Sequence, residues 1–345
     1  MPNYVPTNAA SSGVKLDKRE LKSIASRSDI PGLIYLGCWL ILLSFSGTIV
    51  YLLIGTQWMW PAMFLHGVFI CVPTYAISHE TAHGTAFRTR WINEVVLWVS
   101  SLIYMEEPLH RRYTHTSHHT FTHWEEKDAQ FPYDTPIGLW GWLKEIAGLR
   151  LLRAHLFVFW KLSTKQYTPK MLACVPESEF PKMTRNARVM LVIYSLLTIA
   201  PFANIWSPIW LVFVPRILGA PVMLMFILLQ HVELQENSPS ILESTRSFKT
   251  NWFAKFLYMN MNNHVEHHLY PNVPFYALPK LADALKQQLP PPDPGFFRSN
   301  WEVFWVNFRR ALGLSTKAPS IRQAPHMIID DNINSGEHAR YETHL

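Results

Sequence analysis

The chain of 345 residues contains 16 histidines, and most of them fall into short groups. Three segments, HETAH, HTSHH and HVEHH, have the spacings HxxxH, HxxHH and HxxHH, and His231 lies between the second and the third, at the end of an apolar stretch. In a helix, residues three and four apart share one face, with about 5–6 Å between their Cβ atoms. Each group can therefore direct its imidazole rings at one point. The histidines concerned are His79, His83, His115, His118, His119, His231, His264, His267 and His268.

Such a concentration of imidazole rings predicts a metal site. Nine neutral rings packed together would leave lone pairs unsatisfied and would repel one another when protonated. A bound metal removes both problems. Nine nitrogen ligands exceed what one tetrahedral or octahedral ion uses, so their number predicts two ions. Imidazole binds iron, zinc, copper and nickel, and the residues alone leave the choice of metal open.

Long apolar stretches surround these motifs. The chain is 49% hydrophobic and only 16% charged, whereas an ordinary soluble domain has about 25% charged residues. Residues 31–54, 58–78, 189–206 and 209–230 are each long enough to cross a membrane, which takes about 20 residues. Residues 95–105 are too short and are expected to form an interfacial or re-entrant helix. We therefore predict an all-α integral membrane protein with four transmembrane helices in two hairpins.

The distribution of positive charge predicts the orientation. Lys and Arg are frequent in residues 1–30 and 84–188, whereas the short loops at residues 55–57 and around Ser207 have none. By the positive-inside rule, both termini and the histidine motifs are expected in the cytoplasm, where a helical cap would hold the metals. This divides the chain into a polar N-terminal segment (1–30), a membrane domain (31–290) and a C-terminal segment (291–345) with a flexible tail after Leu314. The three cysteines are too few for an iron–sulfur cluster, which needs four ligands.

On this four-helix frame, the ordered motifs HETAH, HTSHH and NNHVEHHLYP resemble the three histidine boxes of the membrane fatty acid desaturase and hydroxylase superfamily. The resemblance covers about residues 30–290 and includes LYPNVPFYALPKL (269–281), which is similar to the continuation of box three. His231, in LLQHVE, matches the additional histidine ligand that many members have. The resemblance implies two iron ions held by the nine histidines, dioxygen as co-substrate and attack on C–H bonds of a lipid-like substrate. No catalytic residue beyond the metal ligands is implied.

Two departures from the family pattern leave the reaction type open. Thr122 and His123 stand where many desaturases have Thr-Asn, and box one is HExxH where HDxxH is frequent. The expected reaction is desaturation of an acyl-lipid or fatty acid chain. The alternative is hydroxylation, by a monooxygenase of the same superfamily, of an alkane, a terpenoid or a small methylated substrate. The apolar helices imply that the substrate enters from the lipid.

The electrons are expected from a separate protein, because the chain has no recognisable haem, flavin or nicotinamide motif. A soluble ferredoxin, rubredoxin or cytochrome b5, with its reductase, would dock on the basic cytoplasmic face, in keeping with the net charge of +6. No nucleic-acid partner is expected. HETAH alone also matches the zinc protease signature, but that interpretation uses one metal and leaves most of the histidines unexplained. A metal transporter would place ionisable residues along a path between the helices, not past their ends.

Three acidic residues and one histidine are candidates for the surroundings of the metals. Glu80, Asp128 and Glu266 are carboxylates that would orient the second ring N–H of a ligand, with a solvated charge as the alternative. For His123, on the ligand face beyond His119, a surface position is the favoured interpretation, and contact with the site or its hydrogen-bond network is the alternative.

Arg216 is a charge far from either end of the fourth apolar stretch. Charged residues inside a membrane are normally paired or face a cavity. Pro215, Gly219 and Pro221 around it suggest a broken helix. A role in binding a substrate headgroup is one hypothesis, and helix packing or snorkelling is the alternative.

Overall fold

The computed structural model describes residues 7–130 and 136–314, and within these ranges the chain is helical, with no β-strand. This confirms the all-α class. The tail after Leu314 lies outside the described residues. The α-helices are α1 (Lys18–Ile24), α2 (Ile30–Leu53), α3 (Met59–Ala82), α4 (Arg90–Tyr104), α5 (Pro108–Thr120), α6 (Leu139–Ile146), α7 (Leu149–Ser163), α8 (Pro169–Cys174), α9 (Phe180–Ile199), α10 (Val214–Leu229), α11 (Ile241–Ser244), α12 (Trp252–Leu257), α13 (His264–Leu269), α14 (Leu278–Leu285) and α15 (Phe296–Ala311).

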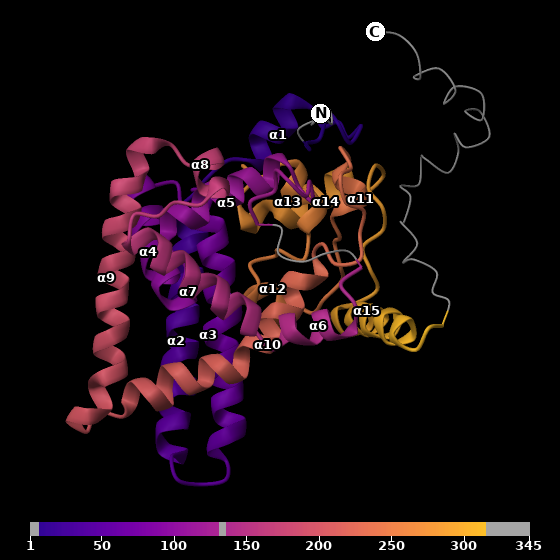
Figure 1. The fold of residues 1–345 in the computed structure, drawn as a ribbon. Coiled ribbons are helices and arrows are strands. Elements are labelled where there is room, and N and C mark those ends of the chain that lie inside the picture. Colours follow the sequence, from indigo (N-terminus) through magenta and orange to yellow (C-terminus); the bar gives the residue numbers. More distant parts are fainter. Residues whose placement is uncertain (1–6, 131–135, 315–345) are drawn as a thin grey trace, which may run out of the picture.

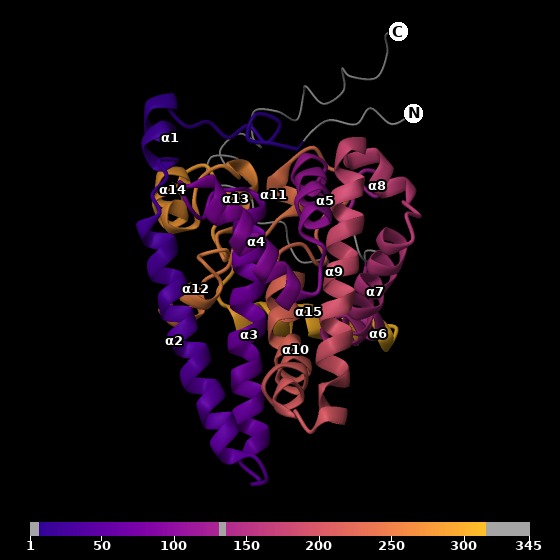
Figure 2. The same ribbon diagram turned by 90° about the vertical axis from the view of Figure 1, so that its left-hand side faces the viewer.

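Four helical segments are long and apolar enough to cross a membrane, as expected from the sequence. They are α2, α3, α9 with its flanking turns, and α10 with the preceding π-helix η3 (Ile209–Phe213). Helices α2 and α3 run side by side and are joined by a short turn (Figures 1 and 2). Helix α3 is the central one, because most of its apolar window is buried, whereas α2 and α9 expose most of theirs. Helix α9 begins at Phe180, earlier than the expected start at Val189.

The fourth apolar segment does not run parallel to the others. Helix α10 crosses in front of the lower part of α2 and α3 in Figure 1, above the turn that joins them, and Figure 2 looks nearly along it. Residues 209–213 form a π-helix, and a regular α-helix follows from Val214. The break that Pro215, Gly219 and Pro221 suggested is therefore a change of helix type, not an interruption of the helix. The arrangement as two membrane hairpins stays a prediction.

Helices α3 and α10 cross in close backbone contact at Gly67 and Gly219. A Cβ atom added to Gly67 would lie 1.8 Å from the Pro215 carbonyl oxygen, and one added to Gly219 would lie 2.0 Å from the Gly67 carbonyl carbon. Only glycine fits on either side of this crossing, since the obstructing atoms are backbone. Small residues are the usual means by which helices approach closely within a membrane.

Replacing Gly67 with alanine is therefore expected to destabilise the protein by about 1–3 kcal/mol or more, the usual cost of overpacking. Gly37→Ala on α2 is the matched control, because a Cβ there meets nothing within 4 Å. Its expected effect is neutral or slightly stabilising, because alanine favours helix over glycine. Melting temperatures in detergent measure both effects. Equal melting temperatures for the two variants would contradict the close crossing.

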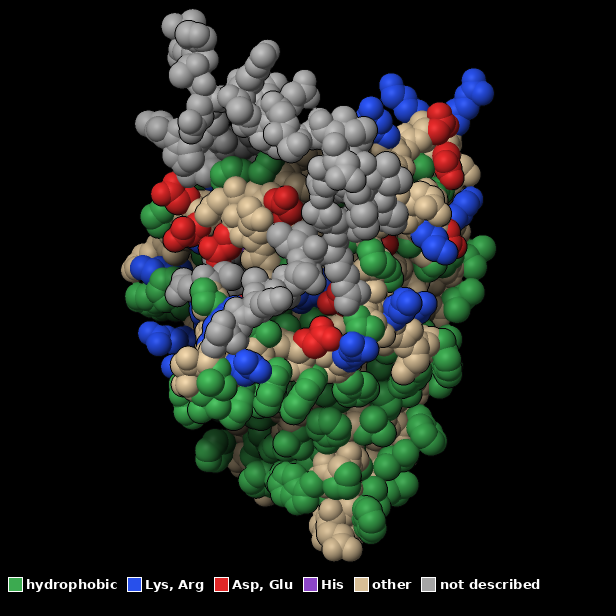
Figure 3. Space-filling model, turned by 90° about the vertical axis from the view of Figure 1, so that its right-hand side faces the viewer, with side chains coloured by type: hydrophobic (Ala, Val, Ile, Leu, Met, Phe, Trp, Pro, Cys, Tyr) green, Lys and Arg blue, Asp and Glu red, His purple; other side chains and the backbone are tan. Residues whose placement is uncertain are grey.

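Charge and apolar surface divide the molecule into two halves. In Figure 3, hydrophobic side chains cover the lower half, while Lys, Arg, Asp and Glu occur on the upper half. The upper half contains α5 and α13, which carry box two and box three, together with α1, α11 and α14 (Figure 1). Helices α6 and α15 contact each other and expose aromatic side chains, including Trp140 and Trp301. The histidines therefore belong to the polar half, next to the apolar part of the molecule.

Candidate metal centre

Four separate elements bring the nine histidines together. Helix α3 provides His79 in its last turn and His83 at its C-cap. Helix α5 provides box two; it begins with Pro108 in its first turn, and the Glu107 side chain caps it by accepting from the backbone N–H of His110. His231 follows the end of α10, and the short helix α13 begins with box three. The ends of α3 and α10 thus meet α5 and α13, the helices that carry box two and box three.

Five of the nine histidines form a first cluster. Each offers a ring nitrogen, and these nitrogens all lie within 4.8 Å of one another. The His115 and His119 Nε2 atoms are 3.1 Å apart. All members are buried apart from His83, which is half-buried. The first cluster consists of His79, His83, His115, His119 and His267.

The remaining four histidines form a second cluster. Ring nitrogens of His118, His231 and His268 lie within 4.8 Å of one another. The Nε2 atom of His264 is 3.1 Å from the Nε2 atoms of both His231 and His268. A separation of about 3 Å is what two ligands give when they bind one metal at right angles with bonds of about 2.1 Å. The clusters adjoin, because the His119 and His268 rings stack at 4.1 Å.

The unsatisfied nitrogen atoms of the first cluster fit a metal site. Both ring nitrogens of His79 and of His267, and Nε2 of His83, are buried without a hydrogen-bond partner among the described residues. Buried polar atoms are normally paired, so these nitrogens point to a ligand. Burial, together with neighbouring positive charge, lowers the pKa of His83 to about 3, and burial also lowers the pKa of His267. Neutral rings with free lone pairs are the form that binds metal.

Hydrogen bonds from outside the clusters fix the orientation of five rings. The contacts are His115 Nδ1 with Gln130 Oε1 at 2.9 Å, His118 Nδ1 with Asp128 Oδ2 at 2.7 Å, His231 Nδ1 with the Ser244 carbonyl at 2.9 Å, His264 Nδ1 with Gln230 at 3.1 Å, and His268 Nδ1 with Thr122 Oγ1 at 3.1 Å. Each bond engages Nδ1, and in four of these rings, those of His115, His231, His264 and His268, Nε2 lies 3.1 Å from Nε2 of another cluster histidine. Such partners orient metal-bound imidazoles and set which nitrogen carries the proton.

Of the three acidic candidates, Asp128 contacts a box histidine directly. The Glu80 carboxylate instead accepts hydrogen bonds from the Thr85 hydroxyl and the Phe275 backbone N–H. Glu266 accepts from the Ser247 hydroxyl, and burial raises its pKa. Both carboxylates therefore hold the box segments against neighbouring loops. The hydrogen bond to a ligand ring that was expected of them is replaced by these contacts. All three are buried, so the alternative of a solvated charge is wrong.

His123 lies beside the second cluster, which corrects the favoured surface position; α5 ends at Thr120, and the turn after it brings His123 there. Its ring centroid is 5.1 Å from that of His231, and only 2% of the residue is exposed, which excludes a surface position. Its backbone N–H donates to Asp128 Oδ2, the oxygen that also bonds to His118. His123 thus helps to hold the carboxylate that orients a box-two ring.

Replacing Asp128 with asparagine is expected to weaken metal binding by about 10- to 100-fold, the usual effect of losing such a partner. Burial raises the pKa of Asp128, but His118 and the N–H groups of His123 and Gln130 lower it more, so the carboxylate is ionised. Asparagine keeps the shape but removes the charge. Metal affinity measured by competition with a chelator tests this. Glu266→Gln is the control, because Glu266 bonds to Ser247, and equal losses in both variants would contradict the prediction.

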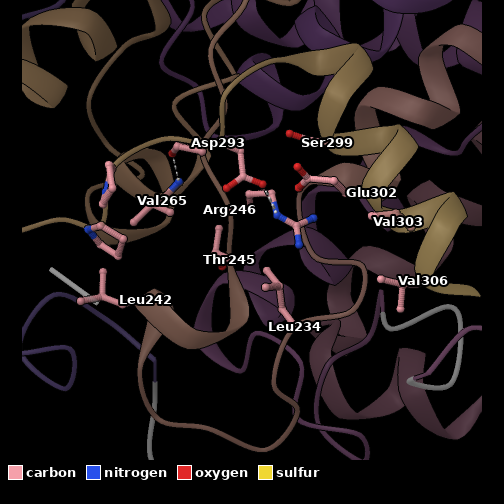
Figure 4. Close-up of a pocket in the computed structure, with 13 residues that line it drawn as sticks. Leu234, Leu242, Thr245, Arg246, Val265, Asp293, Ser299, Glu302, Val303 and Val306 are labelled. Atoms are coloured by element: carbon pink, nitrogen blue, oxygen red, sulfur yellow. Dashed lines mark hydrogen bonds and ion pairs between the residues drawn. The ribbon is translucent and has the colours of Figure 1, made fainter. Parts of the chain in front are cut away.

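Arg246 holds the end of α10, a role that its sequence position does not suggest. Its guanidinium donates to the carbonyls of Leu229 and Val232, on either side of His231, and pairs with Asp293 at 3.0 Å. Figure 4 shows this pair in a cavity of about 280 Å³ between α15 and the segment that precedes box three. Arg246 therefore links the C-terminal helix region to the position of His231.

Arg216 packs helices together, which was the alternative considered for it. Its Nη2 atom donates to the Tyr104 carbonyl at the end of α4 at 2.6 Å, and its own carbonyl lies 3.4 Å from the Cys71 sulfur. These contacts join α10 to α4 and α3. The proposed contact of Arg216 with a substrate headgroup stays a prediction.

A helical membrane protein with two adjoining histidine clusters is the class that this fold and site define. Residues 55–300 match the model of the fatty acid desaturase family, so the chain belongs to that family. A curated relative, the acyl-lipid (9-3)-desaturase of Physcomitrium patens, is 25% identical in an alignment of 233 positions that covers 60% of this chain and 44% of that protein. The chain thus spans less than half the length of this relative.

Proposed function

We propose that this protein is a membrane oxidoreductase that uses dioxygen and two iron ions to introduce a double bond into an acyl chain. The observation that carries the proposal is the pair of adjoining clusters, with buried ring nitrogens that have no partner among the described residues. Family membership favours iron among the metals that imidazole binds. The first cluster would hold one ion and the second cluster the other.

Iron in these clusters would supply the oxidising power to remove hydrogen from an unactivated carbon chain. The protein's own residues position the ligands, keep water away and hold the rings neutral. Forming one double bond takes two electrons from the substrate, and reducing dioxygen to two waters takes four. A donor protein must supply the other two.

We further propose that the polar half faces the cytoplasm and receives that donor. The support is the concentration of Lys and Arg on this half (Figure 3), together with the positive-inside rule. Arg27, Arg88, Arg90 and Arg112 line an opening beside His83, the half-buried member of the first cluster. An acidic ferredoxin, rubredoxin or cytochrome b5 would suit this basic surface.

Metal analysis of anaerobically prepared protein, combined with lipid profiling of cells that express it, tests the proposed function. Two irons per chain and a new unsaturation support it. Two irons and a new hydroxyl group would assign the hydroxylase alternative instead. One zinc per chain with no new product would contradict it. The negative control is the variant in which both His79 and His267 are alanine, whose cells are expected to show no new product.

A further inference from the structure

An aromatic stripe of three exposed side chains runs along helix α15. Phe297, Trp301 and Trp305 follow one another at spacings of four residues, so they share one face of the helix. They are 81%, 60% and 44% exposed. The Trp301 and Trp305 rings stack with their centroids 6.0 Å apart, and the rings of Phe304 and Phe308 pack beside them. A contiguous exposed apolar patch of this kind marks an interaction site.

The opposite side of α15 packs against the protein. The Phe296 ring stacks on that of Phe226 in α10, with the centroids 4.1 Å apart, and Asn307 is buried. In Figure 4, Ser299 and Val303 of α15 line the cavity that separates this helix from the segment before box three. The aromatic stripe therefore faces the outside of the molecule, away from the histidine clusters.

A charged edge lies beside the aromatic stripe. Arg298 and Glu302 each follow a stripe residue in the chain, so they lie about 100° further round the helix. They pair at 3.1 Å, and their side chains are 72% and 49% exposed. Arg309 lies seven residues after Glu302, on the same edge, in the last turn. Aromatic side chains on one face and charges beside them are typical of a helix that lies in a membrane interface, where Trp is enriched.

Helix α6 extends this exposed aromatic surface. Its Trp142 packs against Phe304 with 5.6 Å between the ring centroids, while its Trp140 is 72% exposed. Both α6 and α15 contact α10, one of the four segments that are apolar enough to cross a membrane. In Figures 1 and 2, the two helices lie below α5 and α13 and beside the end of α10. They therefore lie next to the apolar half of the molecule.

This position indicates what covers the aromatic stripe. Side chains of α10 such as Ile217, which is 72% exposed, face lipid if α10 lies in the membrane. Because α15 contacts α10, the same lipid reaches α15 without any further partner. Figure 3 looks onto this side of the molecule and shows Lys and Arg side chains just above the apolar half. Such cations match the phosphate groups of a lipid surface.

We propose that α15 lies flat in the headgroup layer of the membrane, with the aromatic stripe directed toward the acyl chains and the charged edge toward the phosphate groups. The partner is a phospholipid surface, on the side of the membrane next to the polar half. The proposal goes beyond the proposed function, because it depends neither on the metals nor on the reaction. The C-terminal segment is thereby attached to the membrane through a helix that does not cross it.

The lipid-bound helix also contacts a segment that carries a metal ligand. Asn307 Nδ2 lies 3.3 Å from Glu233 Oε1, and Arg310 Nη1 pairs with Glu233 Oε2 at 2.6 Å. The Glu233 side chain is 2% exposed, and Glu233 follows His231 by two residues. Helix α15 therefore connects the membrane surface to the segment that begins with a histidine of the second cluster.

Photo-crosslinking of the full-length protein in nanodiscs of phosphatidylcholine and phosphatidylglycerol tests the proposal. The photoreactive amino acid p-benzoylphenylalanine replaces Trp301 in one variant and Glu302, the next residue on the charged edge, in the matched control. Ile41 of α2, which is 70% exposed, is the reference position for contact with lipid. Mass spectrometry identifies the molecule to which each position is joined.

The variant with the probe at Trp301 is expected to form phospholipid adducts in a yield close to that at Ile41 and several times that at Glu302. Equal lipid yields at Trp301 and Glu302 would overturn the proposal. Adducts at Trp301 with a second copy of the chain, in place of lipid, would assign the aromatic stripe to a dimer and would also overturn it.

A variant without the aromatic stripe tests whether the stripe holds the helix on the membrane. Trp301→Ser combined with Trp305→Ser removes two exposed rings, and serine and tryptophan have similar helix propensities. Hydrogen exchange of residues 296–311 in the nanodiscs is expected to become several times faster than in the wild type. Trp301→Phe with Trp305→Phe keeps the aromatic face and is expected to exchange like the wild type. An unchanged rate in the serine variant, or an equal rise in both variants, would contradict the proposal.

Discussion

Replacing His267 with alanine is expected to remove metal from the first cluster and to abolish oxidation of the substrate. Both nitrogens of this ring are buried without a partner among the described residues, and its centroid lies 4.6 Å from that of His79 and 4.8 Å from that of His83. Without it, the metal in the first cluster loses the ligand that comes from box three. Metal content per chain, measured by mass spectrometry, is expected to fall by at least one ion.

The same substitution is expected to change the stability of the metal-free protein little. An unsatisfied buried polar atom costs about 1–3 kcal/mol, so removing two of them offsets the packing that alanine loses. The metal-loaded proteins are expected to differ widely, because bound metal stabilises only the folded wild type. Melting curves of both forms measure this difference.

His66→Ala is the control for that experiment. His66 is also buried, but its ring bonds to the Ser46 hydroxyl at 2.7 Å and to the Leu211 carbonyl at 3.1 Å, and so joins α2, α3 and η3. It is expected to lower the melting temperature and to leave the metal content unchanged. A His267→Ala protein that retains full metal content, or a His66→Ala protein that loses metal, would contradict the assignment of these roles.

Helical spacing predicted that the histidines of each box gather, whereas His231, which stands alone, was included because of the family resemblance. Side chains three and four residues apart must share a helical face, so each box forms its own local set wherever the helix lies. The positions of the boxes relative to the apolar stretches then predicted that all of them lie at the same end of the membrane helices. Asp128 could be proposed as a partner because it follows box two closely. The position of His123 could not be predicted, because the turn after Thr120, and not helical spacing, brings it to the second cluster.

The other supporting residues could not be predicted, since their partners are distant in the sequence or chemically ordinary. Thr122 reaches His268 and Gln230 reaches His264, and neither contact follows from helical spacing within one segment. Glu80 was expected to serve a ligand but bonds to Phe275, because tertiary packing brings the loop after box three against α3. The course of α10 across α3 depends on the contact between two glycine backbones. An apolar stretch shows that a helix is long enough to cross a membrane, but its direction depends on packing.

The metal-free protein is expected to lose stability steeply as the pH falls below about 6.5, the ordinary value for histidine. Burial and neighbouring rings lower the pKa of several cluster histidines in the folded state. In the unfolded chain these rings bind protons at pH values where the folded protein does not. The unfolded state therefore binds more protons between pH 6.5 and the lowered values, and stability falls with falling pH across that window. The groups are His83, His115, His119, His231, His264, His267 and His268.

The size of this effect follows from the number of groups. Each histidine that is protonated only in the unfolded chain contributes about 1.4 kcal/mol per pH unit. Several such groups acting together exceed the whole stability of an ordinary domain, about 5–15 kcal/mol, within one or two pH units. Urea unfolding of the metal-free protein in detergent at pH 7.5, 6.5 and 5.5 is expected to show a sharp fall below pH 6.5. A midpoint that stays constant to pH 5.5 would show that the rings are solvated and not packed as described.

A substitution that removes one proton-binding site tests the origin of this fall. His267→Gln keeps a polar side chain that does not titrate. The free energy of unfolding of this variant is therefore expected to fall less steeply as the pH falls, and the slope should differ from that of the wild type by about the contribution of one proton. Bound metal requires the same neutral rings as the folded state, so the metal-loaded protein is expected to resist acid until protons displace the metal. Loss of metal and loss of stability should then occur over the same pH range. The contradicting result is loss of metal at a higher pH than the pH at which the protein begins to unfold. The histidines that bind metal would then differ from the histidines whose neutral form stabilises the fold.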